Sequence, residues 1–474
     1  MATTRTPTSW VIPLLVIATA QLMLVLDDSI VNIALPSIQN ELHVDAVHLP
    51  WIVNAYILAF GALLLLGGRI GDLWGRQRTL QLGITVFVIA SLLGGLGQNT
   101  EMLIAARAVQ GLGAAMTAPN ALALITTTFD DRKKQDTALS LYGAMSGLGI
   151  VLGLVLGGVL TDMLNWRWVF FINVPIGLLV LLGSRHLITA DRHTGRLGGI
   201  GAALGTGGLL ALVYAITRFG EEGFSDPVAY ILVAAAVVLL ILFILSQRAS
   251  TQPLLPLSLF GDTNRTGAYL TMLCLAIGPM GTFYVITLYL QQVREFSPLR
   301  TGISWLPFAL GIVVGAAIAP QLLQKIGPRY IAGTAALVSA GGALWFSFIS
   351  TDTGYWTGMA PAMFLVALGF GIGSITLTQA AVYRVDPDKS GIASALLNTS
   401  QQIGVALGLA LLAAVAATVT AGQPTPASHE ALVDGYSTAL LTGTGVLLLA
   451  AVLAVTTLSR EPQSDSTVTA ATAP

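Results

Sequence analysis

The chain has 474 residues, of which 54% are hydrophobic and only 9% are charged. Soluble domains carry roughly 25% charged residues, so this composition excludes a soluble globular protein and indicates a membrane protein. The net charge of −1 argues against a nucleic-acid partner. The single cysteine, Cys274, can form no internal disulfide and offers no spacing for a metal site.

Fourteen segments are apolar over about the 20 residues that a helix needs to cross the hydrocarbon core of a bilayer. In chain order they lie at 11–35, 50–68, 79–98, 102–126, 137–160, 168–187, 199–217, 228–246, 267–291, 302–323, 329–350, 357–381, 392–418 and 437–457. The first is expected to be a retained span, because no small-residue cleavage site precedes a soluble region. The sequence therefore predicts an all-α polytopic membrane protein.

Basic residues fall mainly in alternate loops, and this asymmetry sets the orientation of a membrane protein. With the N-terminus inside, 17 of the 22 lysine and arginine residues lie in cytoplasmic segments and four lie outside. We therefore expect a multi-pass protein of the plasma (inner) membrane with both termini in the cytoplasm. Residues 461–474, which are rich in Ser, Thr, Ala and Pro, are predicted to form a disordered cytoplasmic tail.

Two similar loops suggest an internal repeat. The loops at 72–78 and 324–329 are both short, basic and centred on a glycine. Membrane carriers are commonly built from two repeated halves with the substrate site between them. We expect a six-span bundle over 1–190, two additional spans over 191–250, and a second six-span bundle over 251–460.

Three charged residues lie within the predicted spans and clear of the span ends: Asp27 and Asp28 in the first, and Arg107 in the fourth. A charge at the centre of a span costs on the order of 2.5–3.5 kcal/mol, so such residues are expected to be functional. At about 1.5 Å per residue, Asp27 lies about 25 Å along its helix from Trp10, in the outer third of the membrane. Arg107 lies about 9 Å from the outer surface, at a similar depth. We infer that Arg107 stabilises a carboxylate in one state and releases it in another.

The adjacent carboxyl groups of Asp27 and Asp28 point about 100° apart on the helix. In a low dielectric, each should oppose ionisation of the other, which is a property that a proton-coupled carrier needs. Two alternatives stay open. The pair could simply line an outer aqueous funnel, and Arg107 could be a purely structural lock.

Two further patterns concern helix contacts. Residues Gly68, Asp72, Gly75 and Arg76 form a mixed-charge cluster at a cytoplasmic helix end, which could latch one half of the protein to the other or simply anchor the loop. Residues Gly149, Gly153 and Gly157 recur every four positions in the fifth span. Small residues at this spacing favour close helix packing, and the resulting seam could also hinge or seal a pathway.

Polar and aromatic side chains within the spans are the candidates for substrate binding. They are Asn32, Asn54, Tyr56, Gln110, Asn120, Tyr142, Tyr284, Tyr289, Gln291, Trp305, Gln379, Asn398 and Gln402. A largely apolar pocket with a few polar groups would suit an amphipathic small molecule. Each of these side chains could instead make a hydrogen bond between helices.

Four stretches carry a family resemblance. They are Leu26-Asp27-Asp28-Ser29-Ile-Val-Asn32-Ile-Ala-Leu-Pro36, the loop from Gly68 to Arg78, Arg107-Ala-Val-Gln110-Gly111-Leu-Gly113, and the stretch from Asn165 to Gly177. In order and spacing they resemble the fourteen-span drug:proton antiporter family of the major facilitator superfamily. The resemblance implies two six-helix bundles plus two central spans, and export of hydrophobic or cationic compounds, such as drugs or antibiotics, against proton influx by alternating access.

The resemblance also assigns roles to residues. It places Asp27 at the acidic position of the family, Asp28 at a variable one, and Arg107 at an arginine implicated in proton coupling. Three positions depart from the pattern: Leu154 stands where proline usually follows the glycine, Gln401 replaces an arginine, and Glu295 replaces a glycine. We expect a monomer that is driven by the proton gradient without a cofactor.

Other classes fit the sequence less well. A primary pump would need a phosphate-binding loop, and Lys389-Ser390 lacks its preceding glycine. An enzyme or a metal site would need clustered ligands, whereas the five histidines lie in loops without ligand spacing: His43, His48, His186, His193 and His429. We therefore expect neither. A lipid translocator or a transporter-like receptor of the same fold remains the alternative.

Overall fold

The computed structural model describes residues 10–46, 48–129, 131–187, 197–385, 387–426 and 428–460, with only the backbone described at 126, 132, 133, 136, 140, 221 and 387–390. All regular elements in these ranges are helices. The predicted disordered tail, the loop around His193 and Lys389-Ser390 lie outside the described residues or side chains. Two compact units are present. Unit 1 comprises the described residues up to Leu255 together with Leu290–Ser304, and unit 2 comprises the remainder.

Unit 1 holds the first eight spans. Its helices are α1 (Val11–Leu42), α2 (Trp51–Trp74), α3 (Arg76–Gly95), α4 (Thr100–Thr128), α5 (Arg132–Met163), α6 (Trp168–Phe171), α7 (Asn173–Gly183), η1 (Ser184–His186), α8 (Gly199–Glu222), α9 (Pro227–Ala249) and α11 (Pro298–Ser304). The sixth span is interrupted at Ile172, so α6 and α7 share it with η1. Helix α5 runs without a break past Leu154, the position where the family pattern has proline.

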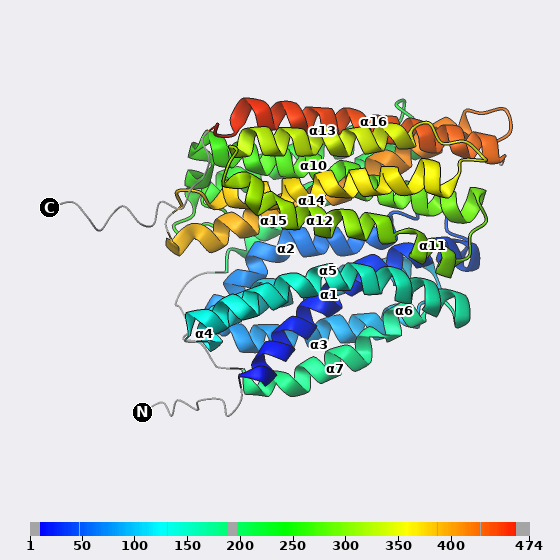
Figure 1. Ribbon diagram of the computed structural model, residues 1–474. Coiled ribbons are helices and arrows are strands. Elements are labelled where there is room, and N and C mark those ends of the chain that lie inside the picture. The colour runs from blue at the N-terminus through cyan, green and yellow to red at the C-terminus, as the bar shows by residue number, and fades with distance from the viewer. Residues whose placement is uncertain are drawn as a thin grey trace, which may run out of the picture. The chain divides into compact units, whose positions relative to one another are not determined.

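Unit 2 holds the remaining six, apart from the first part of the tenth span, α11, which belongs to unit 1. Its helices are η2 (Leu257–Gly261), α10 (Thr263–Leu288), α12 (Leu306–Leu323), α13 (Pro328–Phe346), η4 (Tyr355–Met359), α14 (Ala360–Val382), α15 (Pro387–Ala421) and α16 (His429–Thr457). The short π-helical segment η3 (Tyr289–Val293) continues α10 and crosses the boundary between the units. Helices α10 and α12–α16 run side by side within this unit (Figure 1).

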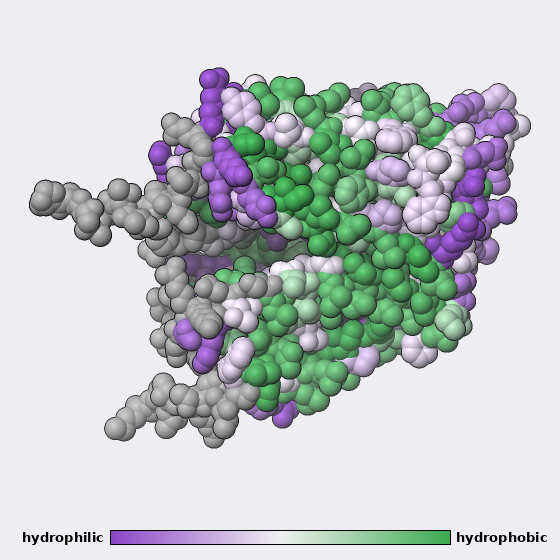
Figure 2. Space-filling model, in the orientation of Figure 1, coloured by the Kyte–Doolittle hydropathy of each residue, from purple (hydrophilic) through white to green (hydrophobic). Residues whose placement is uncertain are grey.

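The structure confirms the predicted fold class, because a long helix or a pair of short ones covers each of the fourteen predicted spans. Among the described residues, thirteen segments are long and apolar enough to cross a membrane, and the fourteenth, α13, is less apolar. Exposed apolar side chains such as Ile231, Val238 and Leu245 run along α9. Hydrophilic residues gather at the helix ends (Figure 2). This surface suits a bilayer, whose core offers no partners for polar groups.

The two units repeat one packing pattern. In unit 1, α1 packs on α5, both α2 and α3 pack on α4, and α3 packs on α7. In unit 2, α10 packs on α15, both α12 and α13 pack on α14, and α13 packs on α16. Glycines on the corresponding helices α2 and α12 allow the close crossings, since a methyl group at Gly67 would overlap the backbone of Ala115 and one at Gly311 would overlap that of Phe364. An internal repeat accounts for this correspondence.

The two additional spans form a hairpin on unit 1. Helices α8 and α9 pack together, and α8 also packs on α2, where the rings of Trp51 and Tyr214 lie 6.0 Å apart edge to face. Asp226 begins α9 by accepting hydrogen bonds from the backbone N–H groups of Val228 and Ala229. The Arg218 side chain donates to the same carboxylate and holds the pKa of Asp226 below its usual range.

One departure from the family pattern has a backbone consequence. Glu295 adopts a left-handed conformation with φ of 52° in the turn between η3 and α11. For a residue with a side chain, this region costs roughly 1–2 kcal/mol, whereas glycine adopts it freely. The usual glycine at this position is therefore explained by the turn, and Glu295 occupies it under strain.

The first span is longer than predicted. Helix α1 continues past residue 35 to Leu42, so Asp27 lies at the midpoint of a 32-residue helix, and its depth in the membrane stays a prediction. The predicted span ends at residue 35 because the polar residues Ser37, Gln39 and Asn40 follow it. Polar side chains end an apolar run, but they do not end a helix whose backbone hydrogen bonds continue.

Candidate functional site

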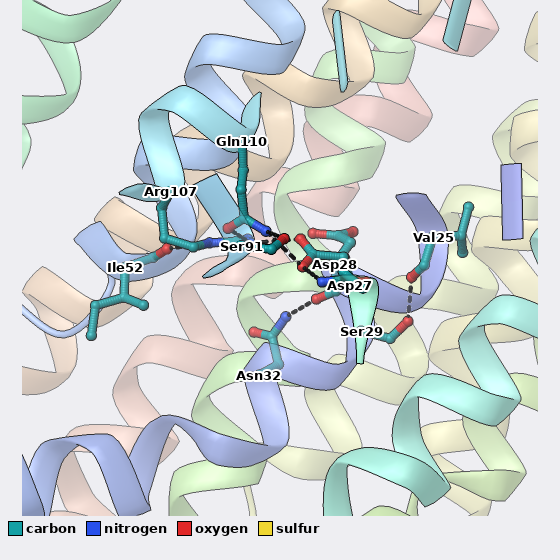
Figure 3. Close-up of polar contacts among 10 residues, drawn as sticks. Val25, Asp27, Asp28, Ser29, Asn32, Ile52, Ser91, Arg107 and Gln110 are labelled. Atoms are coloured by element: carbon teal, nitrogen blue, oxygen red, sulfur yellow. Dashed lines mark hydrogen bonds and ion pairs between the residues drawn. The ribbon is translucent and has the colours of Figure 1, made fainter. Parts of the chain in front are cut away.

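The two oppositely charged side chains predicted at similar depth form a buried ion pair. The Nη1 atom of Arg107 on α4 donates to Oδ2 of Asp27 on α1 across 2.6 Å, and both side chains are 0% exposed (Figure 3). A buried pair of this kind costs much desolvation, which only close geometry and further hydrogen bonds can offset. The surroundings of each partner therefore decide what the pair can do.

The Asp27 carboxylate accepts two more hydrogen bonds, both at Oδ1. Gln110 Nε2 donates across 3.1 Å, and Asn173 Nδ2, from the first residue of α7, donates across 2.7 Å. With Arg107, three donors from two helices surround the carboxylate. All three groups act as donors toward Asp27, and a carboxylate accepts hydrogen bonds at both of its oxygens.

The guanidinium group of Arg107 has contacts besides Asp27. Its Nε atom donates to the backbone carbonyl of Ile52 across 2.9 Å, and its Cζ atom lies 4.3 Å from the centre of the Tyr56 ring. Nη1 also donates to Gln110 Oε1 across 3.1 Å. Nη2 has no hydrogen-bond partner among the described residues. Arg107 is thus anchored to α2 independently of Asp27, and one of its donor groups is unused.

Asp28 has a different environment from Asp27. Its residue is partly exposed, and its buried Oδ1 atom has no hydrogen-bond partner among the described residues. Asn32, one turn later, donates through Nδ2 to the backbone carbonyl of Asp28 across 2.8 Å rather than to a carboxylate. The two adjacent carboxyl groups of α1 therefore differ. Both oxygens of Asp27 accept hydrogen bonds, whereas Oδ1 of Asp28 is available to bind another group.

Sequence reasoning missed three members of the site. Asn173 and Ser91, whose hydroxyl accepts from Gln110 across 2.7 Å, were not predicted, and neither was the Ile52 carbonyl. Asn173 lies in a stretch that was read only as typical of the family branch. Its signal was an uncharged polar residue within an apolar span, which is too common in transporters to stand out.

The predicted substrate-binding residues of unit 1 mostly have partners inside the protein. Gln110 and Tyr56 belong to the Asp27–Arg107 site, and Asn120 donates to the carbonyls of Gly67 and Met116. Gln291 donates to the carbonyl of Ile33 across 3.0 Å. The others are Asn32, Asn54 and Tyr142: both Asn54 amide atoms and Asn32 Oδ1 are buried without a partner among the described residues, and Tyr142 is half-buried.

In unit 2, the same class of residues divides between core and surface. Trp305 is fully buried and donates to Thr287 Oγ1 across 3.1 Å, and the buried Tyr289 donates to the carbonyl of Ser350 across 2.6 Å. The remaining candidates are Tyr284, which is buried, Gln379 and Gln402, which are half-buried, and Asn398, which is exposed. Core hydrogen bonds account for Trp305 and Tyr289 without a ligand.

The predicted latch cluster lies where α2 ends. Gly75, with φ of 104°, separates α2 from α3 in a conformation that favours glycine. Arg76 Nη2 lies 3.3 Å from Asp72 Oδ1, and Nη1 donates to the carbonyl of Ala123 on α4 across 3.2 Å. A methyl group at Gly68 would make only ordinary van der Waals contact with Pro119 on α4. These contacts join helices of unit 1, and the predicted latch between halves stays a prediction.

The predicted packing glycines face the helix that carries Asp27. A methyl group at Gly149 would lie 2.9 Å from Val25 Cβ, one at Gly153 would lie 2.6 Å from Ser29 Oγ, and one at Gly157 would lie 2.9 Å from the carbonyl oxygen of Ile30. The three glycines therefore let α5 and α1 touch along the segment that includes the acidic pair.

Comparisons with known proteins found similar sequences over most of the chain. A model described as Major Facilitator Superfamily matches residues 17–409. The chain is 42% identical to a puromycin resistance protein of Streptomyces alboniger, over 97% of this chain and 94% of that protein. It is 35% identical to a cephamycin export protein of Amycolatopsis lactamdurans, over 88% and 87%.

The fold itself has solved counterparts. A crystal structure of a bacterial homologue of the human lysosomal transporter Spinster, inward-facing and unoccupied, aligns with a TM-score of 0.67 at 15% identity. The alignment covers 94% of this chain and 95% of that one. At this identity, the likeness concerns the fold alone.

Proposed function

The chain belongs to the Major Facilitator Superfamily, and on that premise we propose that it is a proton-coupled antiporter that exports hydrophobic or cationic small molecules by alternating access. The observation that carries the proposal is the fully buried Asp27 carboxylate, paired with Arg107 and bonded by two amides. Ionisable residues within spans typically serve proton or substrate pathways.

The geometry supports a two-state role for Asp27. When ionised, it holds Arg107 on α1; when protonated, it loses the attraction that offsets the burial of both charges. Arg107 would then remain on α2 through Ile52 and Tyr56. Protonation would thus loosen α1 from α4 without leaving the arginine uncontacted. A proton moving inward yields about 2.3 kcal/mol per 100 mV, which would drive export.

The proposed substrate class rests on two supports. The relatives named above are a puromycin resistance protein and a cephamycin export protein, which favours an antibiotic or similar small molecule as cargo. Asp28, partly exposed and with a free carboxylate oxygen, would attract a cationic group beside the proton site. A proton on Asp27 and a cationic group beside Asp28 would each weaken binding of the other, which is the exchange that antiport requires.

The protein is a multi-pass membrane protein of this superfamily. We further propose that it lies in the inner membrane as a monomer, with both termini in the cytoplasm, so that cargo leaves the cell. The bias of basic residues supports this orientation. No cofactor is needed, because the proton gradient supplies the energy.

The decisive experiment is transport in proteoliposomes with an imposed pH gradient, comparing the parent with Asp27→Asn. We expect puromycin or a cationic dye to move with counter-moving protons in the parent, and gradient-driven transport by Asp27→Asn to fall to that of protein-free vesicles. Intact coupled transport by the variant would contradict the role of Asp27. Movement of fluorescent lipids, but of no small molecule, would favour a lipid translocator, and no movement of any compound would contradict export.

A second variant tests the role of Asp28. In the same vesicles, Asp28→Asn is expected to weaken transport of cationic compounds by about tenfold, equivalent to about 1.4 kcal/mol, while a neutral compound keeps its rate. The reason is that Asn keeps the shape of the side chain and removes its charge. Equal loss for cationic and neutral compounds would show that Asp28 does not select charge.

A further inference from the structure

Two amide side chains donate to the same oxygen of Asp27, and they differ in freedom. Gln110 is held in one orientation, because its Nε2 atom also donates to Ser91 and its Oε1 atom accepts from Arg107. Asn173 has no such constraint. Its Nδ2 atom donates to Asp27 across 2.7 Å, whereas its buried Oδ1 atom has no partner among the described residues.

This difference matters when Asp27 gains a proton. A protonated carboxyl group is a donor and needs an acceptor, but the groups around Asp27 are all aimed at it as donors. The Gln110 oxygen is already used by Arg107. The Asn173 oxygen is free, and a half-turn of this amide exchanges its oxygen and nitrogen with little change in shape.

We propose that Asn173 is a positioning residue that bonds both protonation states of Asp27, donating to the carboxylate and, after a half-turn, accepting from the carboxylic acid. Either orientation makes one hydrogen bond to Asp27 and leaves one amide atom unpaired, so the turn costs no hydrogen bond. This inference rests on the proposed role of Asp27 in proton exchange. A neutral Asp27 released from Arg107 would remain hydrogen-bonded to α7, instead of pointing its proton at groups that only donate.

The other ionisable groups near Asp27 are few. They are Asp28 on α1, Arg107 on α4 and Tyr56 on α2, whose ring lies under the guanidinium group. Asp28 could contribute its own titration, so the proton on Asp27 must be identified separately. Asn173 itself carries no charge, and its replacement changes the hydrogen bonds of Asp27 without changing the charge around it.

The test is the pH titration of the Asp27 carboxylic acid band by infrared difference spectroscopy, on the full-length protein in lipid. The band is assigned by its loss in Asp27→Asn and its persistence in Asp28→Asn. In Asn173→Leu each protonation state of Asp27 loses the one hydrogen bond that Asn173 makes with it, so the two losses largely cancel. We therefore expect the midpoint to stay within about half a pH unit of the parent value. A residue that served only as a donor to the carboxylate would instead raise the midpoint by about one pH unit, a tenfold gain of proton affinity, and that result would overturn the proposal.

Three comparison variants show how a change in the titration midpoint of Asp27 is to be interpreted. Gln110→Leu, which removes a donor with a fixed orientation, should move the midpoint higher. Gln247→Leu removes a buried amide on α9 that bonds Ser246 and Leu255, and should leave the midpoint unchanged. Asn173→Ser offers a hydroxyl that both donates and accepts, should likewise leave the midpoint close to the parent value, and tests the proposal if the leucine variant folds poorly. If Asp27→Asn retained coupled transport, the proposed function would fail, whereas a higher midpoint in Asn173→Leu would defeat only this inference.

Discussion

Replacing Arg107 with methionine is expected to destabilise the protein by about 3–5 kcal/mol and to abolish coupled transport. Methionine leaves the Asp27 carboxylate fully buried without the cation that offsets its desolvation. The hydrogen bond to the Ile52 carbonyl and the contact with the Tyr56 ring are lost as well. The loss of stability is measured by heating the detergent-solubilised protein without ligand and finding the temperature at which its monodisperse size-exclusion peak, followed by fluorescence, disappears. Transport in proteoliposomes measures the second effect.

The double variant Asp27→Asn/Arg107→Met is the control for this prediction. With both charges removed, no unpaired ion stays buried, so stability should recover most of the loss seen in either single variant. Transport should not recover, because the carboxyl group proposed to carry the proton, that of Asp27, is absent. If the two single losses simply add, the residues do not stabilise one another, and the ion pair would have no energetic meaning.

The helices were predictable because a bilayer limits the ways to bury a backbone. Each span must satisfy its own hydrogen bonds, so an apolar run of sufficient length becomes a helix wherever it occurs. Helix ends obey another rule. Helix α1 extends to Leu42 because polar residues beyond the hydrocarbon core can continue a helix, and hydropathy carries no information there.

The site was predictable only in its charges. Asp27 and Arg107 stood out because a buried charge is costly and rare within a span. Asn173 and Ser91 did not, because neutral polar residues within spans have many uses. Their roles depend on which helices are neighbours, and contacts between α1, α3, α4 and α7 are set by packing across the whole unit.

The polar candidates illustrate the same limit. Asn120 and Trp305 have the composition of ligand contacts, yet the first bonds carbonyls of α2 and α4 and the second lies fully buried against Phe283 and Phe308. A side chain that can bind a ligand can equally join two helices. Sequence identifies the chemistry that is available within a span, while the fold decides where that chemistry is used.

Substituting leucine for Gly153 is expected to disrupt the Asp27–Arg107 pair, although residue 153 contacts neither side chain of the pair. Even the first atom of a side chain there would lie 2.6 Å from Ser29 Oγ and 3.0 Å from the Leu26 carbonyl oxygen, so α5 and α1 must separate. Overpacking of this kind costs about 1–3 kcal/mol. Because Asp27 follows Leu26 directly, a shift of α1 by about 1 Å would misplace the carboxylate from Arg107, and misplacement on this scale can lower a rate by about 100-fold.

Gly143 provides the matched control, because it lies on the same helix and a methyl group there would meet no atom of the described residues within 4 Å. Gly143→Leu should keep both thermal stability and transport close to the parent, since it changes helix propensity but not the contact with α1. Combining Gly153→Ala with Ser29→Gly should recover part of the activity lost in Gly153→Ala alone, because the second change removes the Oγ and Cβ atoms that the new methyl group meets. If Gly153→Leu transports normally, close contact between α5 and α1 is not what holds Asp27 against Arg107, and the hydrogen bonds from α4 and α7 must suffice to position the carboxylate.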